Sequence, residues 1–217
     1  MRSFLTGLGA CTAVPDNSGV AERRRSLGRR TGSAAMTTSH DIDTPSPWIV
    51  RWAPLIAAGG RILDVACGSG RHARYLAGRG HSVVAVDRDA EALARVEGIP
   101  GVATRVADLE GGPWPFEAAG FDAVIVANYL WRPLFPHLLA AIRPSGVLIY
   151  ETFMRGNERF GRPSNPDFLL APGELLDRIA GALTPVAFEQ GVVSTPKPAA
   201  IQRLCAARAD PDAVFLT

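Results

Sequence analysis

Cysteine is scarce in this sequence, which limits the kinds of disulfide or metal site that the protein could hold. Only Cys11, Cys67 and Cys205 occur in 217 residues, and no two of them form a C-x-x-C pair. An odd number of widely spaced cysteines argues against a disulfide framework and against a zinc site. We therefore expect no bound metal and a reduced, cytoplasmic setting.

Long apolar runs and a large charge of one sign are missing as well. No run approaches the roughly 18 residues that a membrane-spanning helix needs, so no membrane partner is expected. The net charge is +2, and the first 35 residues hold six arginines against two acids. The rest of the chain is slightly acidic, which is not the basic footprint of a nucleic-acid-binding protein.

Residues 1–40 lack any sustained apolar period and contain the basic run ERRRSLGRR. They are predicted to form a disordered basic tail, because such a composition cannot bury a core. Two other interpretations stay open for this segment, a transit peptide and a true start of translation at Met36. The catalytic domain is expected to occupy residues 46–217.

Beyond residue 46, apolar runs of strand length alternate with helical periods. This alternation predicts an α/β fold with a Rossmann-like, doubly wound sheet of about seven strands. Because no helix separates the last two strands, one of them must run antiparallel to the rest. Strands are expected at 61–66, 82–87, 102–108, 121–130, 146–153, 185–193 and 200–209, and helices at 71–80, 90–97, 134–142 and 172–182, with a further helix that begins at Pro47.

The loop after the first strand reads CGSGRHA and contains Gly68-x-Gly70-x-x-Ala73, which fits a dinucleotide fingerprint. An acid, Asp64, stands just ahead of the glycines. It would repel a pyrophosphate, but it would attract the ammonium group of S-adenosylmethionine while loop amides receive the carboxylate. The sequence therefore favours S-adenosylmethionine over a dinucleotide.

Two further acids end the next two strands. Asp87 can accept hydrogen bonds from both ribose hydroxyls of the ligand. Asp108 can accept from an adenine amino group, with Leu109 or a nearby amide at the ring. Three successive strands that each end in an acid are harder to produce by chance than the glycines alone.

The segments LDVACGSGRHA, VVAVDRD, ADLE and FDAVIVANYL resemble, in order and spacing, the motifs of class I S-adenosylmethionine-dependent methyltransferases. The second half resembles the bacterial tellurite-resistance-like subgroup. The resemblance departs at Ala66, where the family often has glycine. It implies S-adenosylmethionine as cofactor and a cofactor site made of Asp64, Ala66, Cys67, Gly68, Gly70, Asp87, Arg88, Asp108, Leu109 and Asn128.

Methyl transfer from a sulfonium mainly needs alignment, and a base is needed only if the acceptor holds a proton. Glu151 and Tyr129 are the candidates for catalysis, although Glu151 could instead orient Arg132 or cap a loop. Candidates for contact with the acceptor are Arg132, Thr152 and Arg162. The last of these lies in segment 154–171, which has the length of a lid or binding loop.

No N-P-P-Y or D-P-P-Y tetrad follows the fourth strand, where ANYL stands instead. Such tetrads serve planar nitrogen acceptors, so a small-molecule acceptor is expected and a nucleic acid is not. The chain is expected to act as a monomer or homodimer. Two alternatives stay open, an NAD-dependent oxidoreductase of Rossmann type and a non-catalytic S-adenosylmethionine-binding protein.

Overall fold

The computed structural model describes residues 43–208, and residues 1–42 and 209–217 lie outside the described part. The predicted tail over 1–40 and the alternative start at Met36 fall on those outer residues and stay predictions. Within residues 43–208, no helix is long and apolar enough to cross a membrane.

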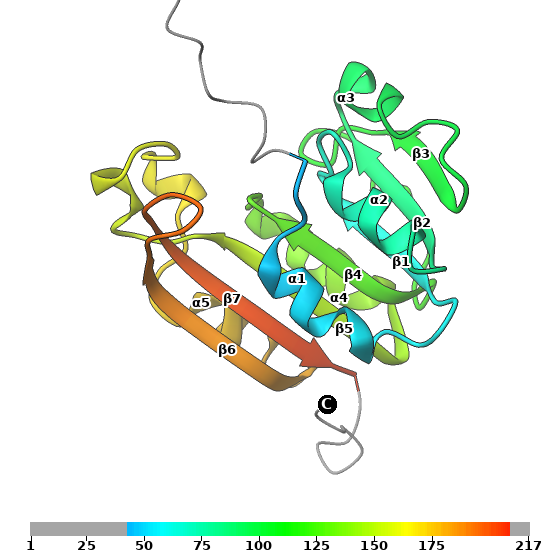
Figure 1. The fold of residues 1–217 in the computed structure, drawn as a ribbon. Helices are drawn as coiled ribbons and strands as arrows, with labels where there is room; N and C mark the ends of the chain where they lie inside the picture. Colours follow the sequence, from blue (N-terminus) through cyan, green and yellow to red (C-terminus); the bar gives the residue numbers. More distant parts are fainter. Residues whose placement is uncertain (1–42, 209–217) are drawn as a thin grey trace, which may run out of the picture. The chain divides into compact units, whose positions relative to one another are not determined.

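The described chain is built on one seven-stranded sheet with the order β3-β2-β1-β4-β5-β7-β6 (Figure 1). Neighbours from β3 to β5 pair in parallel, and β7 runs antiparallel to both β5 and β6. This confirms the predicted fold class and the antiparallel last strand. The strands are β1 (Arg61–Val65), β2 (Ser82–Asp87), β3 (Val102–Val106), β4 (Phe121–Ala127), β5 (Ile142–Phe153), β6 (Thr184–Val193) and β7 (Ala199–Ala207).

Helices cover both faces of the sheet, as Figure 1 shows for α1 and α2 in front and α4 and α5 behind. One apolar cluster packs α1, α2 and α3 on the first face, and a second packs α4 and α5 on the other. Residues 62–65 of β1 are buried throughout, as expected of a strand covered on both sides. The helices are α1 (Pro47–Trp52), α2 (Arg71–Ala77), α3 (Ala90–Ala94), α4 (Phe135–Ala141) and α5 (Glu174–Ile179).

The order of the strands reverses between β1 and β4, which are parallel neighbours in the sheet. From β1 the chain proceeds to β2 and β3 on one side, and from β4 to β5 on the other. Ligands of open parallel sheets bind beyond the carboxyl ends of the strands at such a switch point. The fold therefore places the candidate site at the loops that follow β1, β2, β3 and β4.

The connection between β3 and β4, over the described residues 107–120, has no α-helix, and none was predicted there. The adjacent Gly111 and Gly112 disfavour helix, and Pro113 and Pro115 remove two backbone donors. Most of β3 is consequently exposed.

Two strands also end earlier than predicted. β3 ends at Val106 and β4 at Ala127, so that Asp108 and Asn128 lie in the loops just beyond them. Helix α4 passes directly into β5, which begins at Ile142. The shorter strands leave the polar side chains free to face a ligand at the sheet edge.

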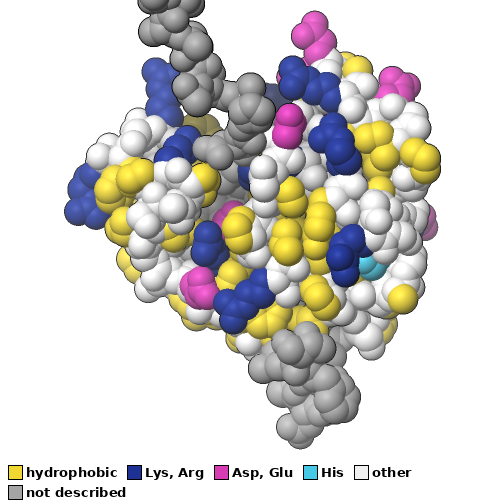
Figure 2. All heavy atoms as spheres, viewed as in Figure 1, with side chains coloured by type: hydrophobic (Ala, Val, Ile, Leu, Met, Phe, Trp, Pro, Cys, Tyr) yellow, Lys and Arg dark blue, Asp and Glu magenta, His cyan; other side chains and the backbone are white. Residues whose placement is uncertain are grey.

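The face seen in Figure 2 carries its arginine and lysine side chains at several separate places, with acidic groups among them. The exposed side chains of Arg51 and Glu189 pair in this way, with 3.2 Å between Nη1 and Oε1. This face therefore shows no continuous basic stripe of the kind that tracks a nucleic-acid backbone.

Candidate active site

A pocket of about 280 Å³ opens where the ends of β1, β2, β3 and β4 meet. Most of the predicted cofactor residues line it, together with Tyr129, which the sequence suggests for catalysis. Ala107 and Glu110 also line it, and the sequence reasoning did not select them. The lining residues are Ala66, Asp87, Arg88, Ala107, Asp108, Leu109, Glu110, Asn128 and Tyr129.

Asp64 lies beneath the glycine loop and is only 1% exposed. Burial raises the pKa of its carboxyl to about 7, against the lowering effects of the Ala73 N–H and of Arg71. Its Oδ2 atom is buried and has no hydrogen-bond partner. A buried acceptor without a donor fits a cationic group brought by a ligand.

The glycine loop turns through left-handed backbone at two positions, Gly68 (φ 55°) and Gly70 (φ 70°). A Cβ at Gly70 would lie 2.5 Å from Cγ1 of Val96, so packing against the end of α3 requires glycine there. A Cβ at Gly68 would meet nothing within 4 Å, which leaves room for a ligand beside the backbone. The Cys67 N–H donates to the Val86 carbonyl at 3.1 Å and fixes the loop to β2.

Cys67 contributes packing and backbone to this loop. Burial raises the pKa of its thiol far above its usual range, and Asp64 and Asp87 raise it further. The sulfur therefore stays protonated and is not a nucleophile.

Asp87 joins the glycine loop to the next strand. Its Oδ2 accepts from the Gly68 N–H at 2.8 Å, and its Oδ1 accepts from the Asp89 N–H at 3.0 Å. Each carboxylate oxygen can accept one further bond. Asp87 is therefore anchored and can still receive two hydroxyls.

Asp108 shapes the loop after β3. Its Oδ1 accepts from the Glu110 N–H at 3.0 Å. Hydrogen bonds from the backbone N–H groups of Glu110 and Gly111 lower the pKa of Asp108. The side chain is exposed and charged at the pocket wall, where it can accept from a ligand amino group.

Tyr129 bridges two sides of the pocket. Its hydroxyl is hydrogen-bonded to the Glu110 side chain, and its carbonyl accepts from the Tyr150 hydroxyl at 2.8 Å. Burial first, and then Glu110, raise the pKa of Tyr129 well above its usual range. At neutral pH this phenol is a hydrogen-bond donor and does not act as an anionic base.

Four non-glycine residues of the described part have left-handed backbone, and two of them lie at the pocket while Ala119 and Ser145 lie elsewhere. The two that line the pocket are Ala66 (φ 51°) and Asn128 (φ 57°). Side chains other than glycine rarely adopt this region, and such residues cluster at functional sites. A glycine would adopt the backbone of Ala66 without this strain.

Replacement of Ala66 by glycine is expected to raise the free energy of unfolding by about 0.5–1 kcal/mol, because relief of strain exceeds the added entropy of the unfolded chain. Urea unfolding of the ligand-free protein measures this. Ala73→Gly, in the interior of α2, is the matched change and should destabilise instead. Equal effects of both changes would show that Ala66 is not strained.

Glu151 lies outside the pocket lining and is already paired. Its Oε1 accepts from the Ser46 hydroxyl at 2.8 Å, and its Oε2 accepts from Nε of Arg203 at 2.5 Å. Its carbonyl receives the Asn128 N–H at 2.8 Å, so its backbone borders the site. The alternative that Glu151 orients Arg132 is wrong, because the partner of Arg132 is Glu174.

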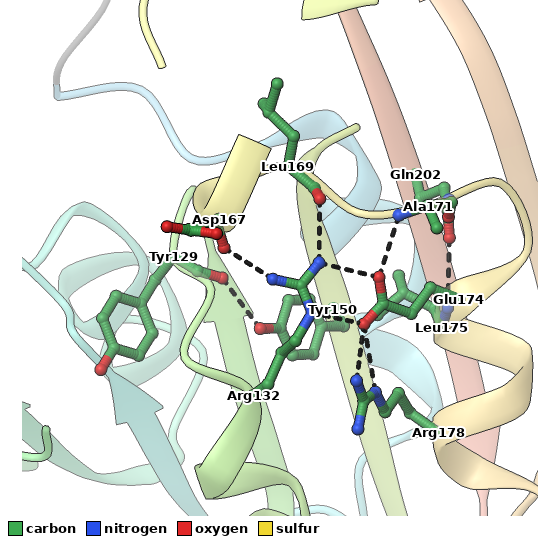
Figure 3. A network of polar contacts seen from close by, with 10 residues as sticks. All are labelled: Tyr129, Arg132, Tyr150, Asp167, Leu169, Ala171, Glu174, Leu175, Arg178 and Gln202. Atoms are coloured by element: carbon green, nitrogen blue, oxygen red, sulfur yellow. Dashed lines mark hydrogen bonds and ion pairs between the residues drawn. The ribbon is translucent and has the colours of Figure 1, made fainter. Parts of the chain in front are cut away.

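The residues suggested for acceptor contact are dispersed. Thr152 is 1% exposed within β5, and Arg162 is exposed on the loop that follows β5. Arg132 directs its guanidinium to Glu174 and to backbone carbonyls (Figure 3). None of the three lines the pocket.

A buried polar contact that the sequence does not reveal joins α1 to the glycine-loop helix. The Ser46 N–H donates to Nε2 of His72 at 3.2 Å. Burial, with a further effect of Arg71, lowers the pKa of His72 to about 3, so the imidazole is neutral. The only sequence signal is Ser46 ahead of Pro47, which indicates a helix N-cap and not a contact with His72.

Among the described residues, no group of three or more His, Cys, Asp or Glu side chains is placed to hold a metal ion.

A family model described as a methyltransferase domain matches residues 62–146. A curated relative, the tRNA U34 carboxymethyltransferase of Methylococcus capsulatus (strain ATCC 33009 / NCIMB 11132 / Bath), is 34% identical over 112 residues. That match covers 47% of this chain and 34% of the relative, so the chain matches about a third of the relative's length.

Solved structures share the fold. TehB from Haemophilus influenzae has a TM-score of 0.63 and 16% identity, over 74% of this chain and 61% of that one. A Burkholderia thailandensis 1,6-didemethyltoxoflavin-N1-methyltransferase, solved with S-adenosylhomocysteine, has a TM-score of 0.54 and 21% identity. That match covers 75% of this chain and 76% of the other. Residues 62–146 therefore match a methyltransferase domain, and the described part of the chain shares the fold of solved S-adenosylmethionine-dependent methyltransferases, which confirms the resemblance.

Proposed function

We propose that this protein transfers the methyl group of S-adenosylmethionine to a small-molecule acceptor. The observation that carries the proposal is the set of acids around the pocket, at the ends of three neighbouring strands. Asp64 lies below the loop, while Asp87 and Asp108 line the wall. A diphosphate would meet like charge at these acids, whereas a cationic amino-acid tail would meet its complement.

The residues fit the cofactor. The unpartnered Oδ2 of Asp64 would receive its ammonium group, directly or through water. The free acceptor positions of Asp87 would hold the ribose hydroxyls, and Asp108 with Leu109 would hold the adenine. Gly68 leaves the space that the methionine end requires.

When bound, S-adenosylmethionine supplies an activated methyl group on a cationic sulfur. The protein then has to hold the acceptor in line and exclude water, and orientation alone supplies about 7–11 kcal/mol in favourable cases. Asn128 and Tyr129 line the pocket after β4, and in this proposal their side chains would orient the acceptor. Neither is a base at neutral pH, which suits an acceptor atom that holds no proton to be removed.

A small acceptor is favoured by the dispersed charges of the face in Figure 2, because a nucleic-acid backbone would be tracked by a continuous basic stripe. The curated relative is named for a tRNA, so RNA is the competing acceptor class. The two classes differ in size and are separable by filtration.

The deciding experiment supplies labelled S-adenosylmethionine with two fractions of a bacterial extract, one of small metabolites and one of total RNA. Label in the small-molecule fraction is expected, and mass spectrometry then identifies the product. Label in RNA alone would overturn the small-molecule assignment. Binding of S-adenosylhomocysteine with no transfer to either fraction would support the non-catalytic alternative.

Proton release on cofactor binding is a further prediction. The ligand-free protein holds a proton on Asp64 below its raised pKa of about 7, and an adjacent ammonium favours the charged carboxylate. Affinity for S-adenosylhomocysteine should therefore rise with pH and level off above about pH 7. Calorimetry in two buffers of different ionisation enthalpy measures the released protons.

The same group makes the ligand-free fold less stable as pH rises. The pKa of Asp64 is about 7 in the folded protein, above its ordinary value of about 4. Between these two pH values the folded state therefore binds more protons than the unfolded state. The contribution of Asp64 to stability is complete below about pH 4 and is lost as pH rises through about 7. Asp64→Asn should abolish both dependences, and a variant that keeps them would show that another group titrates.

A further inference from the structure

The segment between β5 and α5, over 154–171, has the length of a lid. It holds only two short 3-10 turns, at Asn157–Arg159 and Pro166–Phe168. Its ends are closed on each other, because the Arg155 N–H donates to the Leu170 carbonyl at 2.9 Å and the Leu170 N–H donates to the Phe153 carbonyl at 3.0 Å. The segment is thus a compact loop whose two ends meet beside the end of β5.

Two fully buried amides hold this loop. Asn157, 2% exposed, donates to the Pro163 carbonyl at 3.0 Å and accepts from the Ala200 N–H at 3.2 Å. Gln202 on β7, 0% exposed, donates to the Ala171 carbonyl at 2.5 Å. Buried side-chain amides that bond loop backbone fix a conformation that the loop's own sequence does not specify.

Arg132 adds a charged clamp (Figure 3). Its Nε and Nη2 donate to the two oxygens of Glu174 at 2.8 and 2.9 Å. Its Nη1 donates to the Asp167 carbonyl at 2.6 Å, and its Nη2 also donates to the Leu169 carbonyl at 2.9 Å. Glu174 in turn accepts from the Ala171 N–H at 2.9 Å.

The clamp is charged at any ordinary pH. Burial would raise the pKa of Glu174, but hydrogen bonds from Arg132, the Ala171 N–H and Arg178 bring it down to about 2. The guanidinium of Arg132 has five N–H donors in a fixed fork, and it donates four hydrogen bonds within this network. It has almost no capacity left to bind an anionic acceptor.

Arg132 is close in sequence to residues that line the pocket. Arg132 follows Tyr129 by three residues, and the Tyr150 hydroxyl donates to the Tyr129 carbonyl at 2.8 Å. The segment after β4, whose first residues line the pocket, is thus joined to β5 by Tyr150 and to the loop after β5 by the bonds from Arg132 to the Asp167 and Leu169 carbonyls. In Figure 3 the Tyr150 hydroxyl and the Arg132 guanidinium lie between Tyr129 and the Glu174 network.

We propose that Arg132 is a positioning residue that fixes the loop over 155–170 as a rigid wall of the acceptor site, and that it is neither a substrate ligand nor the hinge of a moving lid. The proposal rests on the methyltransferase function proposed above. It predicts that loss of the clamp lowers the affinity for the acceptor and leaves donor binding intact.

The test compares Arg132→Met with Arg178→Met. Arg178 bonds the same carboxylate of Glu174 but no backbone of the loop, so it is a matched control. Four quantities are measured on the full chain: hydrogen exchange of amides 165–171, the Kd of S-adenosylhomocysteine, and KM and kcat for the acceptor identified from the extract. Glu174→Gln, which keeps the size of the side chain, serves if Arg132→Met does not fold.

For Arg132→Met we expect about tenfold faster loop exchange and about a tenfold higher KM, with kcat and Kd changed less than about threefold. Arg178→Met should leave all of them near the wild-type values. Arg132→Lys keeps the charge but not the fork, and should recover only part of the loss.

An unchanged KM in Arg132→Met, or a Kd that weakens in parallel with KM, would overturn the acceptor-wall role. Unchanged loop exchange would overturn the clamp itself. A wild-type protein that binds S-adenosylhomocysteine but methylates neither extract fraction would instead refute the proposed function. The exchange measurement on 165–171 then still decides whether Arg132 fixes the loop.

Discussion

Alanine in place of Asp87 is expected to weaken binding of S-adenosylhomocysteine by about tenfold or more while the protein stays folded. A hydrogen bond to a charged group contributes about 1.5–3 kcal/mol, and about 1.4 kcal/mol corresponds to a factor of ten in affinity. Asp87 would give up its bonds to the ligand and also the tether to the Gly68 N–H at 2.8 Å. Isothermal titration calorimetry measures the affinity, and circular dichroism checks the fold.

Asp89 provides the control two residues further on. Its Oδ1 accepts from the Glu91 and Ala92 N–H groups and caps α3, outside the pocket lining. Asp89→Ala should therefore cost about 1 kcal/mol of stability and leave the affinity unchanged. Unchanged affinity in Asp87→Ala would remove the ribose assignment.

Alanine at Gly70 is expected to have the largest effect on stability, a loss of about 3 kcal/mol in the free energy of unfolding. The new Cβ would lie 2.5 Å from Cγ1 of Val96, where the helix end cannot yield freely. Overpacking typically costs about 1–3 kcal/mol, and the left-handed backbone adds about 1–2 kcal/mol. Urea denaturation of the ligand-free protein measures the loss.

Gly68→Ala separates backbone strain from the steric clash, because Gly68 has left-handed backbone but a Cβ there would meet no atom within 4 Å. We expect a loss of about 1–2 kcal/mol there, with weaker cofactor binding. In the Gly70→Ala protein, a second change of Val96→Ala should lessen the clash. If Gly68→Ala and Gly70→Ala cost the same, contact with Val96 is not what requires glycine at position 70.

The sheet and most of the pocket lining were predictable from local sequence. Strands such as β1 and β4 are buried on both faces, so they appear as short apolar runs. Asp87 and Asp108 follow from the rule that ligands meet the carboxyl ends of parallel strands. These residues could be found because each is fixed by its place relative to a strand end.

The rest of the site depends on contacts between distant residues. Ser46 meets His72 and Glu151, which are 26 and 105 residues away, and no period in the sequence links them. Arg132 pairs with Glu174 across 42 residues, because α5 packs behind the sheet and brings the carboxylate there. Glu110 follows Asp108 closely, but its importance arises only from Tyr129 across the pocket.

The order of the strands separates this fold from the dinucleotide-binding alternative. Dinucleotide-binding sheets follow the order 3-2-1-4-5-6. Here β7 is inserted between β5 and β6 and runs antiparallel to both. The glycine fingerprint alone does not distinguish the two folds, since both need a tight turn between β1 and α2.

Calorimetric titration of the ligand-free protein with S-adenosylhomocysteine and with NAD tests the central claim most directly, that a buried carboxylate under the glycine loop selects a cationic amino-acid tail. Our account predicts saturable binding of S-adenosylhomocysteine, no binding of NAD, and loss of most of the affinity in Asp64→Asn. Binding of NAD with no response to S-adenosylhomocysteine would contradict it.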